Sequence, residues 1–256
     1  MGAIADRLLE GTRAGREARK LLRGNLRVAS VWADCVRGVD EETLTYSVRG
    51  RFPECASFEN DAGEAQMIAF VKRNLANCKP RKGADSCHRQ YHYTDVAIQR
   101  DTYSRAHAGT SDHDLVSAIH AAIAVLRGNE SPAPFRIANR KEALRLLVHY
   151  IGDLHQPLHV GAVYLDARGQ VVDPDKGRFS PATKTGGGNA LNLDGRTLHA
   201  HWDSTRARWT RRAGWRHPAR PWNNGRRCGP RNRWARPDWP IRTCAIPARM
   251  RRDNMN

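Results

Sequence analysis

Pairs of histidine and aspartate four residues apart are the part of this sequence best suited to chemistry. His149 and Asp153 form one pair, and His199 and Asp203 repeat the spacing. Residues four apart lie on one face of a helix, so the imidazole and the carboxylate of a pair can ligate one metal ion or bridge two. His159 follows the first pair just beyond a proline that breaks the helix and lets the chain turn back toward the same place.

Two segments nearer the N-terminus complete a set of four His and three Asp. Asp34 lies in the run ASVWADCVR (29–37), and His92 begins the run HYTD (92–95). Imidazole and carboxylate ligands without thiolate suit a hydrolytic zinc site better than a purely structural one. Several zinc ions close together can activate water and stabilise the leaving oxygen of a phosphate ester. One His/Asp pair alone would more commonly be a surface feature, but the whole set predicts phosphodiester hydrolysis.

These side chains need a scaffold, and the apolar spacing predicts a mainly helical one. Helices are expected over residues 3–22, 111–128 and 137–156. Strand signals are few, with at most a short hairpin around residues 194–195. The Gly-rich stretch 166–190 is expected to be a long surface loop. The predicted fold class is therefore all-α, with long loops.

The formal charge of +17 is concentrated at one end of the chain. Residues 204–256 contain fifteen arginines, no lysine and two acids, which is +13 of that total, together with five tryptophans and no apolar periodicity. We therefore expect a catalytic domain over residues 1–203 and a tail over 204–256 that is disordered or the product of a frame shift. Such a tail attracts any polyanion without specificity.

The cysteine content and the hydropathy of the chain bear on the cellular compartment in which the protein is found. Cys78 and Cys87 close a short loop that a disulfide could staple, although the pairing of the six cysteines stays open. No apolar run approaches the roughly 20 residues that a membrane span requires, so no membrane association is expected. The first residues also lack the pattern of a secretory signal.

The segments that carry the candidate ligands resemble the S1/P1 nuclease family of zinc-dependent single-strand nucleases. The resemblance covers roughly residues 2–204 and rests on ASVWADCVR (29–37), LVHYIGDLHQPLH (147–159), GGN (187–189) and LHAHWD (198–203). It implies a mainly α-helical bundle shared with zinc phospholipase C, three zinc ions, and the release of 5′-phosphorylated products from single-stranded DNA or RNA.

The resemblance also implies which residues do what. One zinc would be held by Asp34, His92, His149 and Asp153, a second by His159, His199 and Asp203, with Asp153 bridging the first ion to a third. Arg37 matches an arginine that would stabilise charge on the phosphate, and Asp95 matches an acid that would orient the attacking water.

The chain departs from the family pattern at its start. In the family, an N-terminal Trp and a His a few residues later complete the third zinc site, and residues 2–5 of this chain would align just after that His. We therefore expect that the true start of the protein lies upstream. The family also leads us to expect a secreted or periplasmic monomer. With only two complete zinc sites, the chain as written should be less active than a chain extended by the missing Trp and His.

Two other functions stay open. A phospholipase C-like lipid phosphodiesterase would share the metal frame, but those relatives usually place Glu four residues after the corresponding His, so Asp203 favours the nuclease. An inactive, metal-poor remnant would bind nucleic acid through its tail without cleaving it. Among neighbouring residues, Trp32 and Trp202 are expected to pack rather than to stack on bases, and His88 is expected to be solvated.

Overall fold

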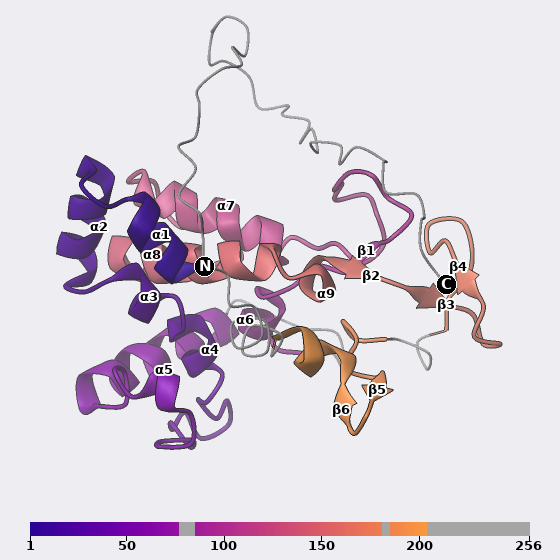
Figure 1. Cartoon of the computed structure of the whole chain (residues 1–256), viewed down its shortest axis with the longest axis horizontal. Coiled ribbons are helices and arrows are strands. Elements are labelled where there is room, and N and C mark those ends of the chain that lie inside the picture. The colour runs from indigo at the N-terminus through magenta and orange to yellow at the C-terminus, as the bar shows by residue number, and fades with distance from the viewer. Residues whose placement is uncertain (77–84, 181–184, 204–256) are drawn as a thin grey trace, which may run out of the picture.

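The computed structural model describes residues 1–76, 85–180 and 185–203, and helices dominate it (Figure 1). The longer helices are α2 (Arg13–Leu22), α5 (Asp61–Ala76), α7 (Leu115–Leu126) and α8 (Arg140–Leu154). The shorter ones are α1 (Gly2–Leu8), α3 (Leu26–Ala29), α4 (Trp32–Val36), the 3-10 helix η1 (Pro53–Cys55), α6 (Cys87–Gln90) and α9 (Pro157–Val160). The mainly helical class expected from the sequence is confirmed.

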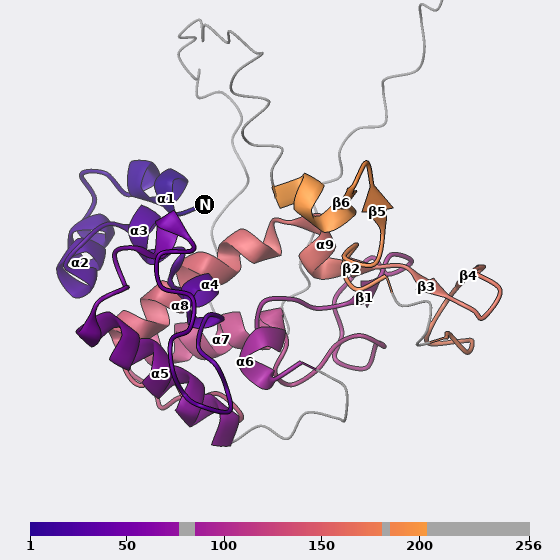
Figure 2. The same cartoon turned by 90° about the horizontal axis from the view of Figure 1, so that it is seen from below.

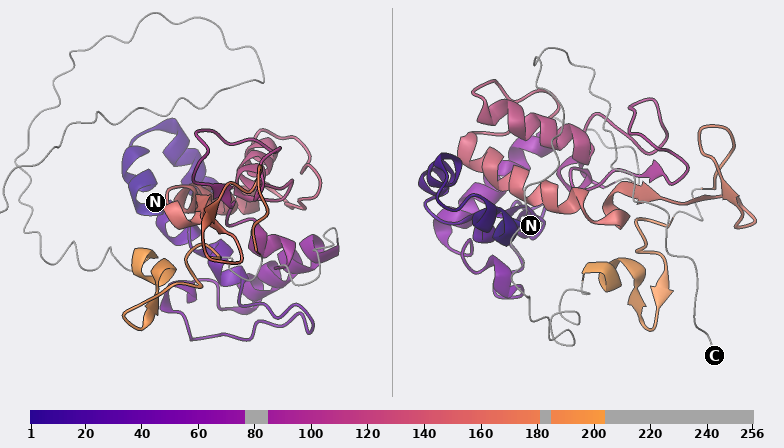
Figure 3. Two further views of the ribbon diagram at one scale, coloured as in Figure 1. Left: turned by 90° about the vertical axis from the view of Figure 1, so that its right-hand side faces the viewer. Right: turned by 45° about the horizontal axis from the view of Figure 1, so that its top comes forward.

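Helix α8 is the central element of the described structure. It begins where the Asn139 side chain accepts a hydrogen bond from the Glu142 N–H at 3.0 Å, and the Glu142 carboxylate accepts one from the Ala138 N–H at 2.9 Å. Helix α7 packs along one side of α8, and α2, α3 and α4 also contact it (Figures 2 and 3). Residues on α8 are therefore held from several directions.

The main core fixes α4 against α5 and α8. Trp32 on α4 is fully buried and meets the Phe70 ring of α5 edge to face, with the ring centroids 5.4 Å apart. Leu146 and Tyr150 of α8 belong to the same buried cluster. Burial of these large apolar side chains stabilises the contact, and it places the helix that carries Asp34 beside the helix that carries His149.

Three short two-stranded pairs accompany the helices in the described residues. β1 (Val96–Ala97) runs parallel to β2 (Gly161–Ala162), β3 (Tyr164–Leu165) is antiparallel to β4 (Val171–Val172), and β5 (Asn192–Leu193) is antiparallel to β6 (Arg196–Thr197). The last pair is the expected hairpin, and both of its turn residues, Asp194 and Gly195, have positive φ. The β1–β2 pair joins the segment after His92 to the segment after His159.

The prediction of one helix over residues 3–22 is wrong, because the chain breaks between α1 and α2. Gly11 adopts a φ of +72°, and the Thr12 side chain caps α2 by accepting a hydrogen bond from the Gly15 N–H at 3.0 Å. The predicted helices over 111–128 and 137–156 are present as α7 and α8, with Asp114 as the cap of α7. The predicted tail and Cys78 lie outside the described residues.

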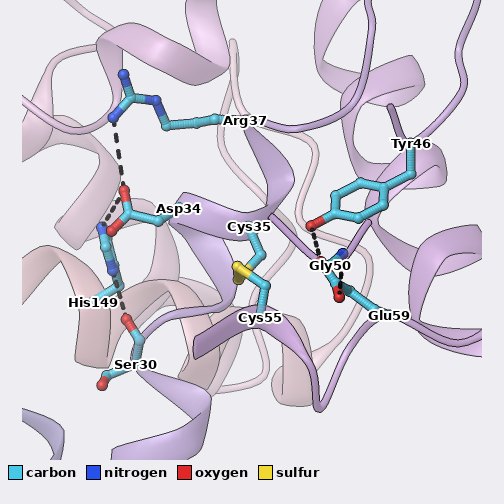
Figure 4. Close-up of a disulfide and its surroundings, with 9 residues drawn as sticks. All are labelled: Ser30, Asp34, Cys35, Arg37, Tyr46, Gly50, Cys55, Glu59 and His149. Carbon is cyan, nitrogen blue, oxygen red and sulfur yellow. Dashed lines mark hydrogen bonds and ion pairs between the residues drawn. A yellow bond between two sulfur atoms is a disulfide. The ribbon is translucent and has the colours of Figure 1, made fainter. Parts of the chain in front are cut away.

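A disulfide joins Cys35 of α4 to Cys55 of η1. Both cysteines are buried, and the bond ties the segment between α4 and α5 to the helix that carries Asp34 (Figure 4). No helix in the described ranges is both long enough and apolar enough to cross a bilayer.

Candidate metal centre

The first set of candidate ligands meets at the buried face of α8. We call Asp34, His92 and His149 the inner group. His149 Nε2 lies 3.0 Å from His92 Nδ1 and 3.7 Å from Asp34 Oδ1. Both histidines are buried, whereas the Asp34 side chain is exposed on the cleft side. Three elements distant in the sequence thus deliver three ligand atoms to one point.

The backbone fixes which nitrogen His149 presents. Its Nδ1–H donates a hydrogen bond to the Ser30 carbonyl at 2.5 Å (Figure 4). Since Nδ1 carries the proton in this arrangement, the Nε2 lone pair faces the other ligands, as in metal-binding histidines held by a backbone carbonyl.

Charge within the inner group shifts the pKa values of its members. Burial lowers the pKa of His149, but the carboxylates of Asp153 and Asp34 outweigh it and raise the pKa to about 9. Burial raises the pKa of Asp153, yet His149 and His92 bring it well below its usual range. Burial lowers the pKa of His92. Without metal, the site therefore favours an ionised Asp153 beside a protonated His149. A metal ion also requires the ionised carboxylate, but it must displace the proton on His149.

The second set of ligands lies on short segments beside the C-terminal end of α8. We call His159, His199 and Asp203 the outer group. His159 Nε2 is 3.2 Å from His199 Nε2, which lies 3.4 Å from Asp203 Oδ2. The Nδ1–H of His159 donates to the His92 carbonyl at 2.9 Å, and that of His199 donates to the Gly187 carbonyl at 2.8 Å.

The geometry of the outer group fits a tetrahedral cation. With each Nδ1–H donated to a carbonyl, the Nε2 lone pairs of His159 and His199 face each other at 3.2 Å, an arrangement that is repulsive unless a cation or proton lies between them. Zinc binds imidazole nitrogen at about 2.0 to 2.1 Å, which places two nitrogen ligands roughly 3.3 Å apart at a tetrahedral angle. The donor set of imidazole and carboxylate also suits zinc.

Asp153 connects the two groups. Its Oδ2 lies 3.1 Å from His92 Nδ1 and 3.1 Å from His149 Nε2, and its Oδ1 lies 3.5 Å from His159 Nδ1. One carboxylate oxygen thus faces the inner group, and the other faces a member of the outer group. Asp153 therefore lies between the two groups, although it faces the His159 nitrogen that donates to the His92 carbonyl and not the one that faces His199.

Both groups open into one cleft of about 1000 Å³. Arg37 lines the cleft, and its Nη1 lies 3.7 Å from Asp34 Oδ1. Figure 4 draws this ion pair as a dashed line. Arg51 and Arg89 line it as well. The cleft thus combines six of the seven candidate ligands, all but the buried His92, with cationic side chains that can attract a phosphate.

The sequence model of the S1/P1 nuclease family matches residues 1–221 of the 256. The chain belongs to the S1/P1 nuclease family. Membership makes it a metal-dependent hydrolase of phosphodiester bonds with nucleic acid as its class of substrate. A search of curated proteins finds no match.

Of the residues expected to act in this S1/P1-family site, all but His92 and Asp95 line the large cleft. His92 is buried against His149 and Asp153. Asp95 instead lines a small separate cavity beside Tyr164, whose hydroxyl donates a hydrogen bond to the Asp95 carbonyl at 2.7 Å. Asp95 is not among the residues that line the large cleft.

Two expectations about neighbouring residues are wrong. Trp32 is buried as expected, but Trp202 is 48% exposed and lines the cleft. His88 is buried rather than solvated, with Nε2 3.5 Å from Glu41 Oε1, and burial lowers its pKa to about 4. The burial of His88 follows from long-range packing, which the local sequence does not reveal.

The Gly-rich loop holds the outer group in place, a role that sequence reasoning missed. Gly187 has a φ of +59°, and a Cβ at this position would lie 2.7 Å from the Leu158 carbonyl oxygen. The loop therefore packs backbone to backbone against α9 and presents the carbonyl that orients His199. The clustered glycines were the available signal, since only glycine combines this φ with so close an approach.

Proposed function

We propose that this chain is a zinc-dependent endonuclease that hydrolyses single-stranded DNA and RNA to 5′-phosphorylated products. The observation that carries the proposal is the pair of ligand groups joined by Asp153 in one cleft. Zinc centres in this arrangement can serve the attacking and the leaving oxygens of one phosphodiester. Asp203, rather than Glu at that position, supports a nucleic-acid substrate over a lipid.

The residues divide the work between holding metal and binding substrate. Zinc, when bound, would act as a Lewis acid and lower the pKa of a water molecule that it binds. The inner group and Asp153 would hold one ion, and the outer group would hold another. Arg37 would bind a phosphate oxygen of the substrate, because its guanidinium stands beside the inner group at the cleft wall.

Asp95 would orient the attacking water. This role requires its side chain to act from the neighbouring cavity. A loss of turnover in Asp95→Asn without loss of zinc would support that role, and unchanged turnover would remove it.

The recessed position of the ligands supports a single-stranded substrate. The His149 and Asp153 side chains are only 8% and 12% exposed, so a phosphate must enter the cleft to reach them. A single strand can bend its backbone into such a recess, whereas a duplex is stiff over this length. The buried Cys35–Cys55 disulfide further supports a secreted or periplasmic protein, because such bonds persist in oxidising compartments.

The test combines zinc content with substrate choice. The purified chain is assayed for bound zinc and for cleavage of single-stranded DNA, single-stranded RNA, duplex DNA and phosphatidylcholine, with and without a chelator. We expect bound zinc, chelator-sensitive cleavage of both single strands and 5′-phosphate ends. Cleavage of the lipid but not of nucleic acid would establish the phospholipase alternative, and neither zinc nor cleavage would establish the inactive remnant.

A further inference from the structure

A cation and an aromatic ring stand together on the wall of the cleft without a role in metal binding. Phe52 is 40% exposed, and both it and Arg51 line the cleft that contains the ligand groups. The Arg51 guanidinium carbon lies 5.3 Å from the centroid of the Phe52 ring. A partly exposed phenylalanine in a cleft is a candidate contact for a ligand, since a ligand that covers the exposed part of the ring would bury apolar surface.

The turn that carries this pair is anchored at both ends. Before it, the Gly50 N–H donates to Glu59 Oε2 at 2.9 Å, and Arg49 Nε pairs with Glu64 Oε1 at 2.7 Å. After it, the disulfide ties Cys55 to α4. Figure 4 shows the Gly50–Glu59 contact and the disulfide on the same segment. A ligand that binds such a fixed turn does not pay the loss of conformational entropy that ordering a flexible segment would require.

The same anchors set the position of the pair relative to the metal centre. Cys35 follows Asp34 directly in the sequence, so the disulfide connects the Arg51–Phe52 turn to the helix of an inner-group ligand. Arg37 lies one helical turn beyond Asp34 and lines the same cleft. The turn that carries Arg51 and Phe52 is therefore tied by a covalent bond to the helix that carries Asp34.

The chemistry of the pair matches one nucleotide of a single strand. A nucleobase stacks on an aromatic ring whatever its sequence, and guanidinium groups bind phosphate and also stack on bases. Among the described residues, three arginines line the cleft (Arg37, Arg51 and Arg89), together with Glu54 and three aspartates that are candidate metal ligands. Bound metal would offset the charge of those aspartates, so the arginines would then favour an anionic ligand.

We propose that Arg51 and Phe52 form a subsite for a nucleotide flanking the scissile bond, with the base on the Phe52 ring and a backbone phosphate on Arg51. The inference rests on the proposed nuclease function and adds a base-dependent contact outside the metal ligands. It assigns to the segment between α4 and α5 a part in substrate binding.

The test separates base contacts from phosphate contacts. Binding to the zinc-loaded full chain is measured by fluorescence anisotropy with an oligothymidylate whose phosphorothioate linkages resist hydrolysis, and with an abasic strand of equal length. The variants are Phe52→Ala, Phe52→Leu, Phe52→Trp and Arg51→Ala. Leu8→Ala and Arg168→Ala are matched controls, because both side chains are highly exposed and neither lines the cleft.

Phe52→Ala should raise the Kd for oligothymidylate about tenfold and leave the Kd for the abasic strand unchanged. Phe52→Leu should weaken binding similarly, because it keeps an apolar side chain but has no ring, and Phe52→Trp should retain binding. Arg51→Ala should weaken both strands alike. The controls should match the wild type.

Equal effects of Phe52→Ala on both strands, or none beyond that of Leu8→Ala, would overturn the subsite. Retained zinc content and melting temperature identify a folded variant, and Phe52→Leu decides the question if Phe52→Ala does not fold. A wild-type chain that binds thymidylate in preference to the abasic strand but cleaves nothing would leave the subsite standing and overturn the proposed nuclease function.

Discussion

The inner and outer groups reach similar ligand geometry by different means. The inner histidines are buried, and α8, packed on several sides, holds one of them. The outer histidines are more exposed and lie on a four-residue helix and on a helical segment that follows a hairpin. Carbonyl acceptors, rather than core packing, orient the outer rings. We infer that the inner group is stable without metal, whereas the outer group depends on a few backbone contacts.

Replacement of Asp153, which both groups share, should have the largest effect. Asp153→Asn removes the negative charge that faces His92, His149 and His159. We expect loss of zinc from both groups and a fall in turnover of about a thousandfold, the scale seen when a group that stabilises transition-state charge is removed. Zinc content and single-strand cleavage provide the measurement, with the exposed Asp101→Asn as control. Two zinc ions retained in the variant would show that the groups are independent.

Gly187→Ala should affect the outer group alone. Its Cβ would approach the Leu158 carbonyl to 2.7 Å and displace the carbonyl that holds His199. We expect zinc affinity at the outer group to fall by about 10- to 100-fold, as for other residues that orient metal-bound histidines. Gly169→Ala is the matched control, because Gly169 has a φ of +78° with open space around it. Equal zinc loss in both variants, in a calorimetric titration, would refute a specific role for the loop.

Zinc binding at the inner group should weaken as the pH falls. His149 has a pKa of about 9, so below that pH a proton occupies the nitrogen that zinc requires. We expect the inner-group affinity to drop about tenfold for each pH unit below about 9, and the Gly187→Ala chain should show this most clearly because its outer group is impaired. Inner-group affinity that does not change between about pH 6 and 8 would contradict the prediction.

Gln156→Ala should have the smallest effect. The Gln156 amide donates to Asp203 Oδ1 at 3.1 Å, and its side-chain oxygen caps α9. We expect a loss of about 1 kcal/mol in stability and a few-fold weaker outer zinc site. Asn25→Ala removes the cap of α3 without touching a ligand, so it should lower the melting temperature similarly and leave zinc binding intact. A zinc affinity that Gln156→Ala does not change would show that Asp203 needs no such support.

The sequence predicts the ligands better than their supports. His/Asp spacing and family motifs identify the cluster because four-residue spacing is a local property of helices, and caps such as Asp114 mark a helix start for the same reason. The Ser30 and Gly187 carbonyls and the Cys35–Cys55 bond join segments far apart in the chain, so local patterns do not reveal them. The missed break at Gly11 shows that periodicity alone can run across a glycine turn.

Anomalous diffraction at the zinc absorption edge, from crystals of the zinc-loaded chain, tests the central claim most directly. We predict one zinc peak among the inner-group side chains and Asp153, and another among the side chains of the outer group. A single peak, or peaks outside the cleft, would contradict a connected metal centre built from these seven residues.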